Sequence, residues 1–405
     1  MKTFRSLDDA DVKGKRVLVR VDFNVPMADG KVADVSRIER NMPTIIEIAD
    51  KGGKVILLSH YGRPKGRDPK ESLRPVVAAV ARIVGRPIAF ADDCVGAAAE
   101  QAVAALKPGD ILCLENTRFH KGEETNDPDF AAKLAKLGDL YVDDAFSVAH
   151  RAHASVEAIG HLLPVYAGRA MEEELDALKR ALLDPERPVT AIVGGAKIST
   201  KLDLLSNLIT HVETLIIGGG MANTFLAAQG KAIGKSLCEN DLLGTAREIL
   251  AKAKALGHDI VLPVDAVVAQ RFAAHVPSRV VAVDDVGPTD MILDIGPRSI
   301  EQAVSVLGRS KTLVWNGPFG AFEHEPFDTG TIEVAEAAAE LTATGRLVSI
   351  AGGGDTMAAL NLAGVTARFT YVSTAGGAFL EWLEGKKLPG VEVLKRERTP
   401  AATHG

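Results

Sequence analysis

Short apolar runs alternate with helical patterns along most of the chain, and glycine-rich or polar turns separate them. The apolar runs are continuous rather than strictly alternating, which is typical of strands covered on both faces. The strand candidates are Val17–Val21, Val55–Leu58, Ile111–Leu114, Leu140–Val142, Val189–Val193, Leu215–Ile217, Ile260–Leu262, Met291–Leu293, Leu313–Trp315, Leu347–Ile350 and Phe369–Val372. The helical patterns include Arg37–Ala49, Pro75–Ile83, Asp203–Ile209 and Thr245–Leu256. This alternation predicts an α/β fold with two doubly wound, Rossmann-like parallel sheets in two domains.

The clearest domain boundary lies around residues 170–187. Met171–Leu183 has the sequence MEEELDALKRALL, with acids in its first turn and bases in its last, which suits the dipole of a single helix. The sequence DPERP at Asp184–Pro188 then ends that helix. We therefore predict a first domain over residues 1–170, an interdomain helix and hinge over 171–187, and a second domain over 188–389.

The composition narrows the classes of partner. Hydrophobic residues make up 46% of the 405 positions and charged residues 25%, as in an ordinary globular chain. The net charge of −6 argues against a nucleic acid partner, so any anion site must be local. Since no apolar run approaches a membrane span and the N-terminus has no signal core, we expect no membrane association. The three scattered cysteines suit a reducing compartment, and we predict a cytoplasmic protein.

Polar residues cluster where the strands of the first half end. They are Asp22, Asn24, His60, Arg63, Arg118 and Arg151, and Arg37 opens the first helix. Ligands of open α/β sheets bind outside the carboxyl ends of the strands, so these side chains are expected on one surface. A guanidinium pairs two oxygens of a phosphate or carboxylate at once, which predicts a small, multiply anionic ligand.

Each of these residues also has a simpler interpretation when it is taken alone. A single arginine is more often a surface residue or an ion-pair partner, and a single histidine such as His60 more often caps a helix or packs in a core. The recurrence of arginine at successive strand ends is what favours the binding site.

In the second half, the strand Val189–Val193 leads into Gly194 and Gly195 and then two lysines, Lys197 and Lys201. Glycine lets the backbone approach a phosphate, and a helix start offers free N–H groups. We expect the two lysines, four positions apart, to share one helix face. An ordinary strand-to-helix turn with surface lysines is the alternative.

Three later glycine turns strengthen the prediction of a nucleotide-phosphate site. They are Gly218–Gly220, Gly352–Gly354 and Gly376–Gly377. Asp355 is placed to hold a hard cation beside a phosphate, although a helix N-cap is the likelier use of a lone aspartate. Glu323 follows the turn at Asn316–Pro318 and can bind ribose hydroxyls.

Two segments come close to standard nucleotide-binding motifs but do not match them. Gly230–Ser236 is one residue short of a P-loop, and Gly218–Asn223 lacks the third glycine of the dinucleotide fingerprint.

Taken together, the motifs resemble the phosphoglycerate kinase family over nearly the whole chain. The resemblance is carried, in order, by VDFNVP (Val21–Pro26), SHYGRP (Ser59–Pro64), LENTRFHKGEE (Leu114–Glu124), DDAFSVAHRAHAS (Asp143–Ser155), GGAKISTKL (Gly194–Leu202), GGGMANTFL (Gly218–Leu226), LPVD (Leu262–Asp265), WNGPFGAFE (Trp315–Glu323) and GGGDT (Gly352–Thr356).

This resemblance implies a monomeric glycolytic enzyme that reversibly transfers a phosphoryl group between ATP and the carboxylate of 3-phosphoglycerate. It implies an active site in a cleft between the domains, domain closure, and packing of residues 390–405 on the first domain. It assigns the substrate to Asp22, Asn24, Arg37, His60, Arg63, Arg118 and Arg151. It assigns the nucleotide to Gly195, Lys201, Asn316, Pro318, Glu323, Gly353, Gly354, Asp355 and Thr356, with Mg²⁺ at Asp355. It assigns stabilisation of the transferring group to Arg37, Lys197, Lys201 and Gly376.

The chain departs from the usual family pattern at Tyr61, Asp143, Ser147–Val148 and Ala375, where Leu, Asn, Gly-Thr and Gly are common. Ala375 matters most because its turn would aim N–H groups at the transferring phosphate, and alanine requires a negative φ there.

Two other functions remain open from the sequence. An NAD-dependent dehydrogenase would use the same sheets, but the fingerprint is incomplete and no ribose-binding acid follows Gly220 at the usual spacing. A non-catalytic, nucleotide-gated binding protein would need a broken site, whereas all of the expected site residues are present.

Overall fold

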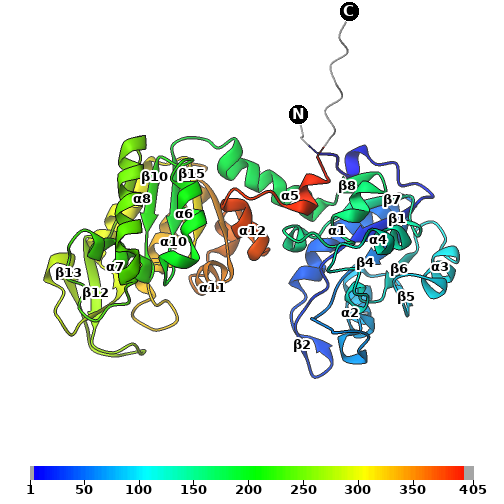
Figure 1. Ribbon diagram of the computed structural model, residues 1–405, viewed down its shortest axis with the longest axis horizontal. Helices are drawn as coiled ribbons and strands as arrows, with labels where there is room; N and C mark the ends of the chain where they lie inside the picture. The colour runs from blue at the N-terminus through cyan, green and yellow to red at the C-terminus, as the bar shows by residue number, and fades with distance from the viewer. Residues whose placement is uncertain (1–3, 396–405) are drawn as a thin grey trace, which may run out of the picture. The chain divides into compact units, whose positions relative to one another are not determined.

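The computed structural model describes residues 4–395, which divide into two compact units. The first unit comprises the described residues up to Leu175 and those from Lys387 onward, and the second comprises Asp176–Lys386. Each unit contains its own six-stranded parallel sheet, in blue to teal for the first and green to orange for the second (Figure 1). The predicted α/β fold with two doubly wound sheets is therefore confirmed.

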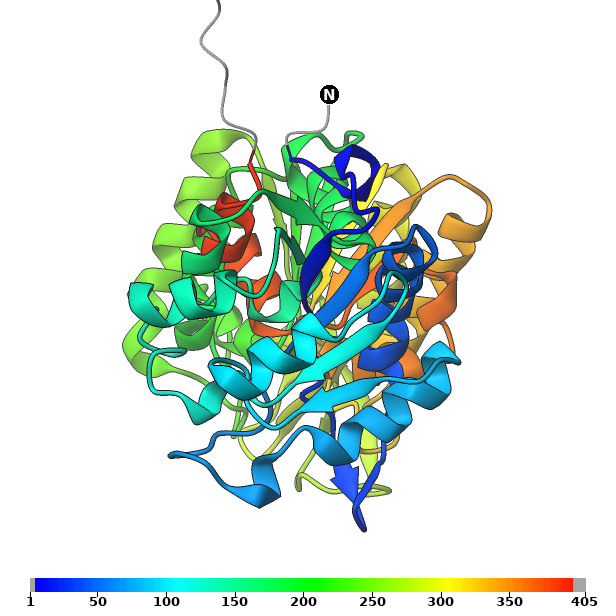
Figure 2. The ribbon, with the colours of Figure 1, turned by 90° about the vertical axis from the view of Figure 1, so that its right-hand side faces the viewer.

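The sheet of the first unit has the order β5-β6-β4-β1-β7-β8 (Figure 2). Its strands are β1 (Arg16–Arg20), β4 (Lys54–Leu58), β5 (Ala89–Ala91), β6 (Ile111–Leu114), β7 (Leu140–Asp143) and β8 (Val165–Ala167), and a small hairpin pairs β2 (Met27–Ala28) with β3 (Lys31–Val32). The helices are α1 (Ser36–Asp50), α2 (Arg74–Val84), α3 (Ala97–Ala104), α4 (Pro128–Ala135) and α13 (Pro389–Glu392).

The central strand β1 shows why the chain folds in this way. Val17 and Val19 pack in one core with Ile38, Ile45 and Ile48, which recur at helical spacing along α1. Parallel pairing on both sides, with β4 and β7, buries the strand completely apart from its first residue. The carboxyl ends of β6, β4, β1 and β7 are therefore neighbours at one edge of the sheet.

The sheet of the second unit has the order β11-β10-β9-β15-β16-β17. Its strands are β9 (Val189–Val193), β10 (Thr214–Ile217), β11 (Asp259–Val261), β15 (Thr312–Asn316), β16 (Val348–Gly352) and β17 (Tyr371–Ser373). The helices are α6 (Leu202–Leu208), α7 (Gly219–Ala228), α8 (Leu243–Leu256), α9 (Pro297–Arg309), α10 (Thr329–Ala343), α11 (Gly354–Leu362) and α12 (Gly377–Leu383). The strand order reverses between β9 and β15, and ligands of such sheets bind at that point.

One predicted strand exists but, contrary to the prediction, does not belong to either parallel sheet. Met291–Leu293 lies in β14 (Met291–Ile295), which pairs antiparallel with β12 (Asp265–Ala269), and β12 also pairs antiparallel with β13 (Ser278–Ala282). β13 is largely exposed, so it lacks the continuous apolar run by which the parallel strands were found. The short strands β5 and β8 carried too few residues to be recognised.

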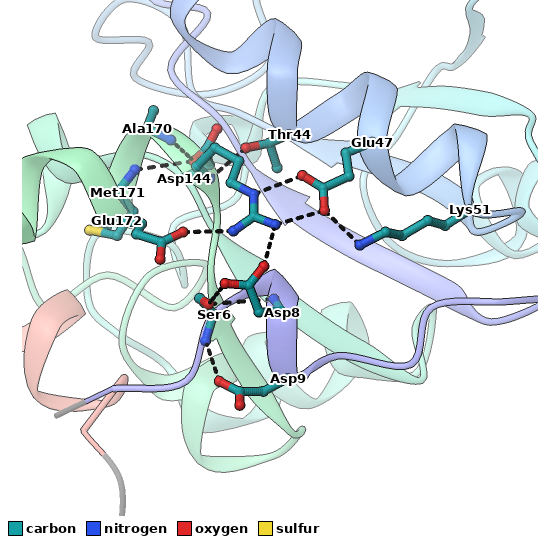
Figure 3. Close-up of polar contacts among 11 residues, drawn as sticks. Ser6, Asp8, Asp9, Thr44, Glu47, Lys51, Asp144, Ala170, Met171 and Glu172 are labelled. Carbon is teal, nitrogen blue, oxygen red and sulfur yellow. Dashed lines mark hydrogen bonds and ion pairs between the residues drawn. The ribbon is translucent and has the colours of Figure 1, made fainter. Parts of the chain in front are cut away.

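The predicted helix Met171–Leu183 begins two residues early, as α5 (Arg169–Leu178), and continues as a π-helical turn over Lys179–Leu183. Its first turn is anchored in the first unit (Figure 3). Asp144 Oδ1 accepts the N–H groups of Ala170 and Met171 at 2.9 and 3.2 Å. The Arg169 guanidinium donates to Glu47 and Asp8. The start of the connecting helix is thereby fixed by tertiary contacts that its own sequence does not show.

The chain returns to the first unit near its end. The Gly390 N–H donates to the Ala149 carbonyl at 2.9 Å, and Lys395 forms a bridge with Phe4. Residues 396–405, the remainder of the segment predicted to pack back, lie outside the described residues. No helix between residues 4 and 395 is both long and apolar enough to cross a membrane.

Candidate active site

The loops after β1, β4, β6 and β7 are joined by direct contacts. Arg37 Nη1 donates to Asp22 Oδ2 at 3.1 Å, and Ser147 Oγ donates to the same oxygen at 2.6 Å. The Gly62 N–H donates to Asn24 Oδ1 at 2.9 Å, and Arg118 Nη1 donates to the Gly62 carbonyl at 2.7 Å. These contacts bring Asp22, Asn24, Arg37 and Arg118 together at one edge of the sheet.

The arginines of this edge retain unused donors. Buried Arg118 leaves Nε and Nη2 without a hydrogen-bond partner within residues 4–395, and its Nε lies 3.6 Å from Glu124 Oε1. Arg63 is exposed, and no described hydrogen bond or ion pair occupies its guanidinium. Because buried polar groups are normally satisfied, the open donors of Arg118 indicate an anionic ligand.

His60 lies within the field of three arginines. Burial lowers the pKa of His60 well below its ordinary value, and the charges of Arg20, Arg118 and Arg151 lower it further. Arg118 and Arg151 also lie close enough to each other that Arg151 lowers the Arg118 pKa, after the larger effect of burial. The site therefore concentrates positive charge while His60 stays neutral.

Arg20 is a site residue that the sequence analysis missed. It is completely buried and donates from Nε to Ser155 Oγ at 2.8 Å and from Nη2 to His60 Nδ1 at 3.1 Å. A guanidinium can only donate, so Nδ1 of His60 must accept and Nε2 must carry the ring proton. Arg20 therefore fixes His60 as a neutral donor. The signal was available, because β1 ends in an arginine after three apolar residues.

Two adjacent carboxylates at the end of β7, Asp143 and Asp144, are fully buried, and burial raises the pKa of each to about 7. Asp144 is well bonded, since Asn41 Nδ2 donates to its Oδ2 at 2.8 Å in addition to the α5 contacts. Asp143 accepts from the Ala145 N–H at 3.1 Å, but its Oδ2 has no partner within the described chain. Asp143 thus places an incompletely satisfied carboxyl at one of the positions where the chain departs from the pattern that the resemblance leads us to expect.

The second unit places Lys201 at the point where the strand order reverses. Its Nζ donates to the Gly194 carbonyl and to Asn316 Oδ1, both at 2.7 Å, at the ends of β9 and β15. Burial lowers the pKa of Lys201 to about 8, and the charge of Asp355 raises it in part. A lysine held in this way remains cationic at pH 7 without a carboxylate bound to it.

Lys197 does not lie on a helix face with Lys201, so that prediction was wrong. Lys197 is extended, with φ −136° and ψ 134°, and a single 3-10 turn over Ile198–Thr200 separates it from Lys201. Helix α6 begins only at Leu202. The exposed Lys197 side chain is consequently independent of the half-buried Lys201 side chain.

The glycine turns pack on one another where the strands end. A Cβ on Gly194 would lie 1.8 Å from the Pro318 carbonyl oxygen, so only glycine allows the turns after β9 and β15 to meet. Asn316 Nδ2 donates to the Gly352 carbonyl, and the Gly317 N–H donates to Thr356 Oγ1, each at 2.8 Å. Asn316 and Thr356 thus hold three loops together.

A largely apolar cavity of about 420 Å³ lies beside these turns. Gly195, Pro318, Glu323 and Asp355, four of the predicted nucleotide residues, line it. The other lining residues are Ala196, Gly219, Gly220, Ala222, Asn223, Leu226, Leu237, Pro263, Ala266, Phe272, Met291, Ile292, Leu293, Asp294, Ile295, Phe319, Gly320, Ala321 and Phe322. An apolar pocket with phosphate-binding turns at its rim suits a nucleoside base joined to phosphates.

The turn after β17 tolerates the alanine that departs from the family pattern. The described non-glycine residues with positive φ are Asp29, Asn126 and His275, so Ala375 has the negative φ that it requires. Gly376 instead has the positive φ, 49°, and precedes α12.

Comparisons with known proteins agree along nearly the whole chain. The model of the phosphoglycerate kinase family matches residues 7–386. A phosphoglycerate kinase of Bradyrhizobium diazoefficiens is 64% identical over 392 residues, which is 97% of this chain and 98% of that protein. A phosphoglycerate kinase of Rhodopseudomonas palustris is 64% identical over 394 residues, 97% of this chain and 99% of that protein. The structure of phosphoglycerate kinase from Coxiella burnetii superposes with a TM-score of 0.90 at 41% identity, covering 96% of this chain and 98% of that one.

Proposed function

The chain belongs to the phosphoglycerate kinase family and is a glycolytic phosphotransferase, and from this premise we propose how its residues perform the reaction. A carboxylate oxygen of 3-phosphoglycerate forms a bond to the γ-phosphorus of ATP as the bond to the ADP oxygen breaks. The products are 1,3-bisphosphoglycerate and ADP, and the reaction is reversible.

We assign 3-phosphoglycerate to the edge of the first sheet. Its phosphate and carboxylate oxygens accept hydrogen bonds from the open guanidinium donors of Arg63 and Arg118. Arg37 and Arg151 contribute further positive charge to the same site. His60 donates from Nε2, while Asp22 and Asn24 are placed to orient the substrate hydroxyl. The observation that carries this assignment is the unsatisfied, buried guanidinium of Arg118.

We assign the nucleotide to the glycine turns of the second sheet. The base and ribose occupy the apolar cavity, where Gly195, Pro318 and Glu323 line the wall. The phosphates lie along Lys201 and the start of α11, where Gly353, Gly354 and Thr356 offer N–H groups at a helix N-terminus. Asn316 acts mainly by holding Lys201 in place.

Asp355 fits the magnesium ion that ATP ordinarily carries. Its side chain is exposed in the first turn of α11, lines the cavity and lies close enough to Lys201 to affect its pKa. One carboxylate together with phosphate oxygens is the usual protein site for Mg²⁺, which would neutralise phosphate charge there. Asp355 is thus the proposed magnesium ligand.

The chain's own residues need supply no general base, because a carboxylate with a pKa of about 4 is already ionised at pH 7. We propose that Arg37, Lys197 and Lys201 neutralise the charge on the transferring group. The N–H groups of the turn at Gly376 would donate to the same group. Catalysis then consists mainly of positioning and charge stabilisation.

Transfer requires the two ligands to meet, so we propose that the units approach each other during turnover. The division between the compact units falls inside α5, and the helix changes to a π-helical turn before the proline-rich segment Asp184–Pro188. A π-helical turn is often found at functional sites, and we place the hinge over residues 171–187.

Free Cys94, Cys113 and Cys238 support a reducing, cytoplasmic location, and we propose a monomer.

Dependence of ADP formation on the acceptor tests the proposed function. With ATP and Mg²⁺, ADP should accumulate only when 3-phosphoglycerate is present. Equal ADP formation without it would indicate an ATPase, and no ADP in either case would favour a non-catalytic binding protein. The alternative dehydrogenase would instead reduce NAD with an added substrate, which the family membership does not favour.

A further inference from the structure

A second cluster of ligating side chains lies near the edge strands of the first sheet, apart from the residues assigned to substrate. Asp93 and Cys94 follow β5, and His120 follows β6, its neighbour in the sheet. A carboxylate oxygen, the Cys94 Sγ and a ring nitrogen of His120 all lie within 4.8 Å of one another. Three different donor atoms from two loops thus converge on one point.

The orientation of these groups is set by their neighbours. The His120 ring stacks on Phe130, with centroids 5.1 Å apart and planes inclined by 23°. Its Nε2 faces Asp93 Oδ1 at 2.7 Å. The Cys94 N–H donates to the same carboxylate oxygen at 2.7 Å, and Arg67 Nη1 lies 3.5 Å from the other. The ring and the carboxylate are held in place before any ligand binds.

Cys94 differs from the other two cysteines. Its side chain is completely buried, and no hydrogen bond of its thiol is found among residues 4–395. Cys113 is also buried, but its thiol faces the Leu114 carbonyl, and within residues 4–395 it belongs to no group of three ligating side chains. Cys238 is partly exposed and lies near Asn240. In the described part of the chain, Cys94 alone of the three is grouped with both a histidine and a carboxylate.

We propose that Asp93, Cys94 and His120 form a binding site for one Zn²⁺-like divalent cation. A sulfur, an imidazole nitrogen and a carboxylate oxygen are the three ligand types that Zn²⁺ takes in proteins, and water would complete a tetrahedron. The ion takes the place of the proton between His120 Nε2 and Asp93 Oδ1 and of the thiol proton of Cys94, and both protons pass to solvent. Mg²⁺ and Ca²⁺ require oxygen ligands, so the magnesium that accompanies ATP does not compete.

An entry path exists on one side of the site. The side chains of His120 and Asp93 are 32% and 29% exposed, whereas Cys94 is completely buried and forms the inner side of the site. An ion arriving from solvent therefore meets the nitrogen and oxygen first and the sulfur last.

Cobalt tests the site, because Co²⁺ takes the same ligands and gives a sulfur-to-metal charge-transfer band when a thiolate binds it. The full-length protein is titrated with Co²⁺ in the presence of excess Mg²⁺. We expect one equivalent to bind with that band and an intense tetrahedral visible spectrum, and one equivalent of Zn²⁺ to bleach both.

Substitutions identify the ligands. Cys94→Ser should abolish the charge-transfer band, and His120→Gln should weaken Co²⁺ binding by about 100-fold or more, since even outer-shell partners cost 10–100-fold. Cys113→Ser and Cys238→Ser should leave both unchanged. The proposal is overturned if wild-type protein gives no charge-transfer band, or if the band is lost in Cys238→Ser. If Cys94→Ser does not fold, the His120→Gln result decides, and undiminished affinity in that variant rejects the site.

Discussion

Lys201 Nζ donates to Asn316 Oδ1 at 2.7 Å and so spans the two strands, β9 and β15, between which the order of the second sheet reverses. Within residues 4–395, the oxygens that accept hydrogen bonds from Lys201 Nζ are all uncharged amide oxygens of Gly194 and Asn316. The lysine is therefore positioned by neutral oxygens, and its positive charge is available to a phosphate.

Lys201→Met tests that role. It removes the charge but retains much of the side-chain volume, and we expect kcat to fall by about 10²–10³, as for a lost donor to transition-state charge elsewhere. Steady-state kinetics with both substrates measures the loss. Lys231→Met is the matched control, because Lys231 is a lysine of the same unit that pairs with Asp284. An equal loss in both variants would remove Lys201 from the mechanism.

Arg37→Ala should lower kcat by a comparable amount, about 2.7–4 kcal/mol of transition-state stabilisation. Arg37 is only half-buried, and its contacts with Asp22 and the Asn24 carbonyl aim it at the loops that we assign to substrate. Arg16→Ala is the control, since Arg16 pairs with Asp139 at the other end of β1. A change in KM with unaltered kcat would restrict Arg37 to ground-state binding.

Asp143→Asn should stabilise the protein more at pH 8 than at pH 5. Burial raises the pKa of Asp143 to about 7 in the folded state, whereas the unfolded chain has about 4. The folded state holds a proton that the unfolded state releases between these values, so stability falls as pH rises through this window. The substitution removes that loss, and we expect a gain on the order of 1–4 kcal/mol at pH 8.

Thermal unfolding at the two pH values measures this gain. Asp139→Asn is the control, because its hydrogen bond with Arg16 lowers the Asp139 pKa, and that substitution should destabilise at both pH values. A pH-independent effect of Asp143→Asn would contradict the account.

The hinge proposal predicts that alanine at Pro185 and Pro188 alters ligand-dependent compaction. These prolines follow the π-helical turn and limit the backbone between the units. Small-angle scattering with and without both substrates, paired with turnover measurements, compares the double variant with wild type. Unchanged compaction and unchanged turnover would show that the hinge lies elsewhere.

The sequence predicted the parts of the molecule that repeat a local pattern. The parallel strands have continuous apolar runs, and the arginines and glycine turns follow them at the strand ends. It failed where the outcome depends on distant partners. The shared helix face of Lys197 and Lys201 was wrong, because a 3-10 turn intervenes and Lys201 is drawn to Asn316, more than 100 positions away. An arginine after the apolar run of β1 is visible in the sequence, but the role of Arg20 depends on His60, which follows β4.

The most direct test of the central claim is the detection of the acyl phosphate itself. With ATP, Mg²⁺ and 3-phosphoglycerate, hydroxylamine should trap one hydroxamate for each ADP formed, and Lys201→Met should lower both products in equal proportion. ADP formed without hydroxamate, or hydroxamate formed at an undiminished rate by Lys201→Met, would contradict the account.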